Sequence, residues 1–233
     1  MKPISFWHRL LDIISPRCCV VCGRRLSISE EVLCARCHLH LPRTDFHLSA
    51  YDNEMARLFW HLIPIQRAAA LFYFEPHAET ANLIYTMKYQ YHPEVGEVMG
   101  RLTATEFQQA GFFDEIDEIV PIPLARSRQR QRGYNQSMEI ARGVSAVTGI
   151  PVLDKAVRRL NFKGSQTHKG RWERQENVEE VFELTDPAAL QGHHLLLIDD
   201  IVTTGATILA CARELVKAGD VRISVLALGF AKS

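Results

Sequence analysis

The sequence predicts an α/β fold, in which an open parallel sheet is flanked by helices and preceded by a small cysteine-rich module. Apolar runs of strand length occur at 68–74, 119–123, 195–198 and 221–228. Such near-continuous runs are typical of parallel strands that are buried on both faces. Between them, apolar residues recur with helical spacing. Two adjacent acids and a hydroxyl-rich loop follow the run 195–198, where open α/β sheets bind ligands.

The composition is that of an ordinary globular protein. Of the 233 residues, 47% are hydrophobic and 23% are charged, and 27 Lys and Arg balance 27 Asp and Glu. This balance gives no overall basic field that would favour nucleic acid or an anionic membrane. No apolar run approaches the roughly 18 residues of a transmembrane helix. The N-terminal region lacks the apolar core and cleavage site of a signal peptide, so we expect a cytoplasmic protein.

The first residues form a short amphipathic stretch. Its apolar residues include Phe6, Trp7, Leu10 and Leu11, and it is interrupted by charged residues. We expect a helix that packs on the body of the protein. The alternative is a peripheral anchor at the inner face of a membrane.

Five of the six cysteines lie between Cys18 and Cys37, and such clustering in a reducing compartment indicates metal binding rather than disulfides. Two C-x-x-C pairs, separated by eleven residues, predict a closed tetrahedral site for a structural zinc ion. The expected ligands are Cys19, Cys22, Cys34 and Cys37. Cys18 is an alternative to Cys19, with one more residue between it and Cys22. We assign residues 1–42 to an N-terminal helix plus this four-cysteine zinc-binding module.

Residues 43–65 are expected to connect this module to a main domain at 66–233. The connecting segment carries a short helix near Trp60. The main domain begins with the strand 68–74, and helical spacing then predicts helices at 82–90 and 93–110. Lys88 is interpreted as a solvated lysine near the end of the first helix.

An arginine-rich stretch follows the strand 119–123. Four arginines alternate with other residues from Arg126 to Arg132, and a helix is expected at 137–147. Guanidinium groups neutralise and orient linked phosphates, so the stretch predicts a pyrophosphate-binding loop. The candidate ligand-binding residues are Arg126, Arg128, Arg132 and Gln136. A solvated basic loop or a nucleic-acid patch is the alternative.

An extended segment at 151–160 precedes a polar segment that reaches residue 182. A polar stretch of this length between regular elements is typical of a loop. Arg171 and Arg174 are three residues apart, so on a helix they would share one face toward the phosphates. Both are candidate ligand-binding residues.

Residues 195–207 give the clearest indication of function. A hydroxyl- and glycine-rich loop before the helix expected at 208–218 offers backbone N–H groups and hydroxyls to an anion. The candidates are Thr203, Thr204, Gly205, Ala206 and Thr207. The carboxylates of Asp199 and Asp200 suit vicinal sugar hydroxyls or a Mg²⁺ shell. Together they predict a ribose 5-phosphate site; the alternative is a solvated acid pair before a threonine-capped helix.

The residues 195–207 resemble, at every position, the phosphoribosyl pyrophosphate (PRPP) motif of type I phosphoribosyltransferases. The run from Arg132 to Ser137 and the order Gln166, Arg171, Arg174, Asn177, Phe182 resemble the ComF family. The chain therefore resembles ComFC-like and GntX-like proteins with an N-terminal zinc-finger module. The resemblance implies a type I phosphoribosyltransferase-like sheet, PRPP with Mg²⁺ as ligand and a loop that closes over PRPP. It also implies a link to competence, DNA uptake and the competence helicase machinery.

Phosphoribosyl transfer would need an anchor for the 5-phosphate, groups for the sugar hydroxyls and cations for the departing pyrophosphate. Asp199 and Asp200 are the candidate catalytic residues of such a pentosyl-transferring glycosyltransferase. No residue indicates a pocket for the acceptor, so the acceptor, the activity and the oligomeric state stay open. The second hypothesis is a non-catalytic accessory protein that binds single-stranded DNA through its arginine clusters and Trp172.

Overall fold

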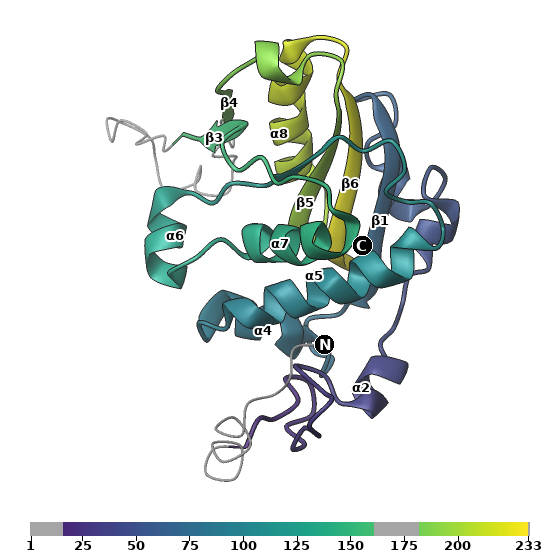
Figure 1. Cartoon of the computed structure of the whole chain (residues 1–233), viewed down its shortest axis with the longest axis vertical. Coiled ribbons are helices and arrows are strands. Elements are labelled where there is room, and N and C mark those ends of the chain that lie inside the picture. The colour runs from purple at the N-terminus through teal and green to yellow at the C-terminus, as the bar shows by residue number, and fades with distance from the viewer. Residues whose placement is uncertain (1–15, 161–181, 233) are drawn as a thin grey trace, which may run out of the picture.

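A parallel four-stranded sheet forms the centre of the computed structural model, which describes residues 16–160 and 182–232 (Figure 1). The strand order is β1 (Ile65–Phe74), β6 (Arg222–Ala231), β5 (His194–Val202), β2 (Glu118–Pro121). All three strand pairings are parallel. The central strands β5 and β6 are buried along most of their length, as their apolar sequences predict. The predicted open parallel sheet is confirmed.

Helices cover the sheet on both faces. The connection from β1 to β2 contains α4 (Ala81–Tyr89) and α5 (Pro93–Gln108), and α7 (Gln136–Thr148) packs against α5, β5 and β2. The connection from β5 to β6 contains α8 (Ala206–Leu215) and runs along the sheet in the opposite direction. Because such crossovers are right-handed, α8 lies on the other face.

The pair α5 and α7 approaches almost backbone to backbone. A Cβ atom added to Gly143 would lie 2.1 Å from the carbonyl oxygen of Glu97, and one added to Gly100 would lie 2.3 Å from that of Ile140. Only glycine fits at these two positions. This close crossing brings the N-terminus of α7 to the carboxyl end of β5, where the acid pair lies.

The remaining elements are short. The antiparallel strands β3 and β4 form a separate pair, and α8 packs against both. Their bounds and those of the short helices are α2 (Ala35–Leu39), η1 (Phe46–Ser49), α3 (Glu54–Arg57), α6 (Arg126–Arg132), β3 (Val157–Arg159), β4 (Phe182–Leu184), η2 (Ala188–Leu190) and η3 (Val216–Ala218).

Two elements differ from the sequence-based expectation. Strand β5 does not end before the acid pair, because its pairing with β6 continues from Asp199 to Val202. The arginine-rich stretch is not a loop but the helix α6, which ends at Gly133 in the left-handed conformation with φ 80°. Arginine and glutamine are strong helix formers, and a glycine with positive φ is a usual helix terminator.

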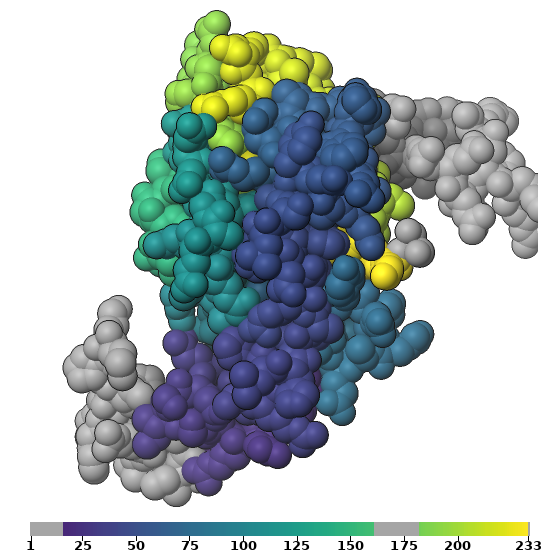
Figure 2. Space-filling view, turned by 90° about the vertical axis from the view of Figure 1, so that its right-hand side faces the viewer, coloured from purple at the N-terminus to yellow at the C-terminus, as the bar shows by residue number. Residues whose placement is uncertain are grey.

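The N-terminal region lies along the outer edge of β1. The backbone N–H of Tyr73 donates to the carbonyl of Pro42 at 2.8 Å, and Arg43 forms a bridge with Phe72. The guanidinium of Arg43 also makes two hydrogen bonds to the Glu106 carboxylate of α5, at 2.9 and 2.6 Å. In Figure 2 these segments, purple to dark blue, cover this side from the cysteine module to the main domain.

Some predicted features lie outside the described residues. These are the amphipathic stretch with Phe6 and Trp7, and the polar loop with Arg171, Trp172 and Arg174. Among the helices that the structure describes, none is long and apolar enough to cross a membrane.

Candidate functional site

Two carboxylates at the carboxyl end of β5 form the floor of the site. The Asp199 carboxylate accepts a hydrogen bond from the Ser137 hydroxyl of α7 at 3.1 Å and one from the Asp200 backbone N–H at 2.9 Å. The Asp200 carboxylate lies 3.0 Å from the Lys88 ammonium of α4. Burial and the neighbouring Asp200 carboxylate raise the pKa of Asp199 to about 7. Among the described residues, Lys88 is the one cation that forms an ion pair with either acid, so the negative charge of the two acids is incompletely balanced there.

The position of Lys88 corrects the expectation of a solvated lysine. Its side chain is only 18% exposed and forms an ion pair with Asp200, whose side chain is 11% exposed. Lys88 lies four residues after the fully buried Ile84, on the apolar face of α4. A lysine at a core-facing helical position was the sequence signal for this role.

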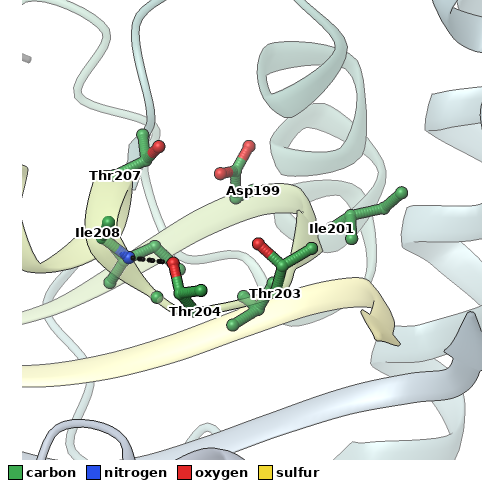
Figure 3. A pocket seen from close by; sticks show the side chains of 9 residues that line it. Asp199, Ile201, Thr203, Thr204, Thr207 and Ile208 are labelled. Carbon is green, nitrogen blue, oxygen red and sulfur yellow. Dashed lines mark hydrogen bonds between the residues drawn. The ribbon is translucent and has the colours of Figure 1, made fainter. Parts of the chain in front are cut away.

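The loop after β5 has the form of an anion site. Gly205 caps α8 in the left-handed conformation with φ 75°, and Thr203 and Thr204 are exposed. The Ala206 N–H donates to the Thr204 hydroxyl at 3.4 Å. A hollow of about 50 Å³ is lined by Asp199 and residues 201–208 (Figure 3). The start of α8 thus offers backbone N–H groups and threonine hydroxyls to one small anion.

A larger pocket of about 270 Å³ adjoins this loop. Asp199, Thr203 and Thr207 line both spaces, so the small hollow and the larger pocket lie next to each other at the end of β5. The polar residues that line the larger pocket are Lys88, Arg128, Arg132, Ser137, Arg159, Asp199, Asp200, Thr203 and Thr207. The apolar ones are Phe74, Ile122, Leu124 and Ile201. Acids thus face arginines across a single space.

The helix α6 divides the four arginines between two faces. Arg128 and Arg132, four residues apart, line the larger pocket, whereas Arg126 does not. Gln136 is 1% exposed and also lies outside the lining. Its side-chain carbonyl accepts a hydrogen bond from Arg132 at 2.8 Å, and its amide donates to the Met87 carbonyl at 3.2 Å. Gln136 therefore orients Arg132 instead of facing the pocket.

Arg159 is a pocket residue that sequence reasoning missed. It lies at the end of β3, with its guanidinium 5.5 Å from the centre of the Phe182 ring of β4. Its position depends on the pairing of β3 with β4, two segments that the polar loop separates in sequence. Two consecutive arginines at 158–159 were the only local signal.

The four cysteines of the two C-x-x-C pairs form one cluster. Their sulfur atoms all lie within 4.8 Å of one another, and the Sγ atoms of Cys22 and Cys34 are 3.8 Å apart. A tetrahedron with zinc–sulfur bonds of about 2.3 Å has edges of about 3.8 Å, so zinc fits these ligands. Cys18 is exposed, lies outside the cluster and directs its thiol to the Pro16 carbonyl at 3.6 Å. The structure thus favours Cys19 over Cys18.

Fold and site together define an α/β protein that has a pocket of acids, arginines and threonines at the carboxyl end of its central strand and a four-cysteine module on one side. Proteins with names from DNA metabolism are similar to it in sequence. The chain is 29% identical over 213 residues to the DNA utilization protein YhgH of Escherichia coli K12, a match that covers 90% of this chain and 88% of the relative. Competence protein F of Haemophilus influenzae is 25% identical over 90% of this chain and 95% of its own.

The competence protein ComFC of Bacillus subtilis is 27% identical over 90% of this chain and 75% of its own length. These relatives confirm the resemblance to the ComF family. Among solved structures, the PRPP amidotransferase of B. subtilis aligns with a TM-score of 0.40 and 18% identity, covering 60% of this chain and 30% of that one. No family model matches the chain.

Proposed function

We propose that the chain binds PRPP, or a closely related phosphorylated ribose, in the pocket at the end of β5. The observation that carries this proposal is the convergence of three kinds of group on one space. A hydroxyl loop at a helix start, a carboxylate pair and three arginines all line it. Ribose with a 5-phosphate and a pyrophosphate carries the complementary groups in one molecule.

Each group has one role in this proposal. The loop 203–207 holds the 5-phosphate through backbone N–H groups and hydroxyls. Asp199 and Asp200 accept hydrogen bonds from the ribose hydroxyls. Arg128 and Arg132 face the pyrophosphate, and Arg171 and Arg174, which lie outside the described residues, stay predicted ligands of the phosphates. Arg126 and Gln136 are not among the ligands we propose, because neither lines the pocket.

The same site would support phosphoribosyl transfer. In that reaction the bond between C1 of ribose and the pyrophosphate oxygen breaks, and a bond from C1 to the acceptor forms. Arginines aimed at the departing pyrophosphate would stabilise its charge, while the acid pair holds the sugar in place. Mg²⁺ would be held mainly by phosphate oxygens and would neutralise part of the charge that develops.

We further propose that the four-cysteine cluster holds a structural zinc ion. Four protein ligands leave no open coordination position, so this zinc would stabilise the module and take no part in chemistry. We assign the module to residues 1–42 and the phosphoribosyltransferase-like domain to 66–233. Cysteines clustered for a metal favour a reducing compartment, which supports a cytoplasmic location.

Binding of single-stranded DNA is a second candidate function, and a surface next to the pocket favours it. Arg126 and Arg130 are exposed on α6, and neither has an ion-pair partner among the residues the structure describes. Tyr89 and Tyr91 are 69% and 67% exposed, and the Arg132 guanidinium lies 6.0 Å from the centre of the Tyr89 ring. Exposed aromatic rings beside arginines suit stacked bases and a phosphate chain. The name of one relative, DNA utilization protein, agrees with a role that involves DNA.

Calorimetric titration of PRPP with Mg²⁺ into the purified protein tests the first function. We expect micromolar binding that is lost in the double variant Asp199→Ala, Asp200→Ala. Absence of binding to a folded, zinc-loaded protein would contradict the proposal. Titration of a fluorescent oligothymidine then tests the second function. Its affinity should fall with salt and should weaken in Arg126→Ala, Arg130→Ala.

A further inference from the structure

The loop of the proposed phosphate site rests on a residue from the connecting segment, far away in sequence. A Cβ atom added to Gly205 would lie 2.8 Å from Cε1 and 3.0 Å from Cζ of Phe59, and 3.7 Å from Cβ of Leu58. Gly205 is buried, although its neighbours Thr204 and Ala206 are exposed. The phenyl ring therefore lies directly beneath the backbone of the loop, on the side away from solvent.

Phe59 is in turn held firmly. Its side chain is fully buried, as are those of Met55 and Ala56 in α3. The buried Asn53 caps α3 by accepting from the Ala56 N–H at 2.9 Å, and its side-chain amide donates to the Ala68 carbonyl of β1 at 2.8 Å. The chain of contacts thus runs from the sheet through Asn53 and α3 to Phe59, and from Phe59 to Gly205.

This arrangement explains why a glycine is required in the loop for two independent reasons. Its φ of 75° is unfavourable for any residue with a side chain. The space that a side chain would fill is taken by the Phe59 ring. The edge of the Phe59 ring therefore limits how closely the loop backbone can approach the buried segment beneath it.

We propose that Phe59 is a positioning residue for the anion site. Its ring holds the 203–207 backbone in the position from which the N–H groups can bind the phosphate. The proposal rests on the proposed PRPP-binding function. It extends the site beyond the domain at 66–233, since the segment from Asn53 to Phe59 then belongs to the binding machinery.

The variant Phe59→Leu tests this role, with Phe107→Leu as the matched control. Phe107 is equally buried but lies in α5, against Phe112 and His47. Both variants remove a ring from the core, so we expect similar losses of thermal stability. Only Phe59→Leu should speed amide hydrogen exchange of Leu209, whose N–H donates to the Gly205 carbonyl at 2.8 Å, by about tenfold in the ligand-free protein. It should also weaken PRPP binding about tenfold.

Unchanged exchange of the Leu209 amide in Phe59→Leu, or an equal increase in Phe107→Leu, would overturn the proposal. Phe59→Met has a volume similar to that of the leucine variant but a more flexible side chain that can fill the site, and it is read in the same way if the leucine variant does not fold. The exchange measurement needs no ligand. If the unaltered protein fails to bind PRPP, the proposed function fails, whereas the exchange result still decides whether Phe59 positions the loop.

Discussion

At the scale of single residues, charge balance around the acid pair dominates the site. Two carboxylates lie next to each other on β5, and one ammonium group, that of Lys88, pairs with Asp200. Asp199 is left with hydrogen-bond donors instead of a cation. A ligand that brings hydroxyl donors or a divalent cation would complete the balance. The site is thus prepared for binding at the expense of the stability of the empty protein.

The raised pKa of Asp199 gives a prediction with a definite sign. Its pKa rises from an ordinary 3.8 to about 7 in the folded protein, so the folded state binds this proton more tightly than the unfolded state. The stabilisation of the folded protein by the Asp199 proton is present at low pH and is lost as the pH rises from about 4 to about 7. Asp199→Asn should therefore gain in melting temperature over the unaltered protein across this range.

Thermal unfolding at pH 5 and pH 8 measures this difference. The exposed Asp154→Asn serves as the control and should show the same small effect at both pH values. If the difference in melting temperature between Asp199→Asn and the unaltered protein did not change with pH, the raised pKa of Asp199 would be contradicted.

Removal of Lys88 should expose the cost of the buried acid. Lys88→Met leaves Asp200 without its cation and should lower the free energy of unfolding by about 3 kcal/mol. Adding Asp200→Asn to this variant should restore much of the loss, because the unpaired charge is gone. Urea unfolding of the four proteins gives the coupling directly. Strictly additive effects would mean that the ion pair has little energetic role.

At the scale of elements, the arginines of α6 point in different directions from those they would take in an extended loop. In an extended loop, alternate arginines would all point to one side. In a helix, Arg128 and Arg132 share a face that lines the pocket, and Arg126 and Arg130 lie on another. Helix propensity and the terminating Gly133 contained this information, but the alternation of the arginines favoured a loop.

The helices α5 and α7 cross so closely at Gly100 and Gly143 that neither position has room for a side chain. Gly143→Ala would gain helix propensity, which on an open helix stabilises by about 1 kcal/mol. Here the added methyl meets the Glu97 carbonyl at 2.1 Å, so we expect a net loss of about 3 kcal/mol. Denaturant unfolding measures this change in the free energy of unfolding, with Ser145→Ala on the same helix as control. A neutral or stabilising effect would contradict the close packing.

The cysteine module should depend on its metal. We expect one zinc ion per chain by elemental analysis of the purified protein, and its loss in Cys37→Ser together with a lower melting temperature. Cys18→Ser is the matched control, because Cys18 lies outside the cluster. Zinc retained in Cys37→Ser and lost in Cys18→Ser would reverse the assignment of the ligands.

At the scale of the whole molecule, the sequence was informative where function depends on consecutive residues. The apolar runs located the strands of the sheet, the paired C-x-x-C spacing located the cysteine cluster, and residues 195–207 located a loop that lines a hollow at the end of β5. The contributions of Lys88, Arg159 and Phe59 were missed or misread. Each reaches the site from a different segment, through packing that no local pattern encodes.

The central claim is that one pocket holds a phosphorylated ribose between the loop after β5 and one face of α6. The most direct test compares PRPP affinity, in the presence of Mg²⁺, between Arg128→Ala, Arg132→Ala and Arg126→Ala, Arg130→Ala. Both double variants remove two positive charges from the same helix. We expect PRPP affinity to fall about tenfold or more in Arg128→Ala, Arg132→Ala and to change little in Arg126→Ala, Arg130→Ala. Equal losses would show that PRPP senses only the overall charge of α6, and would contradict a ligand held in this pocket.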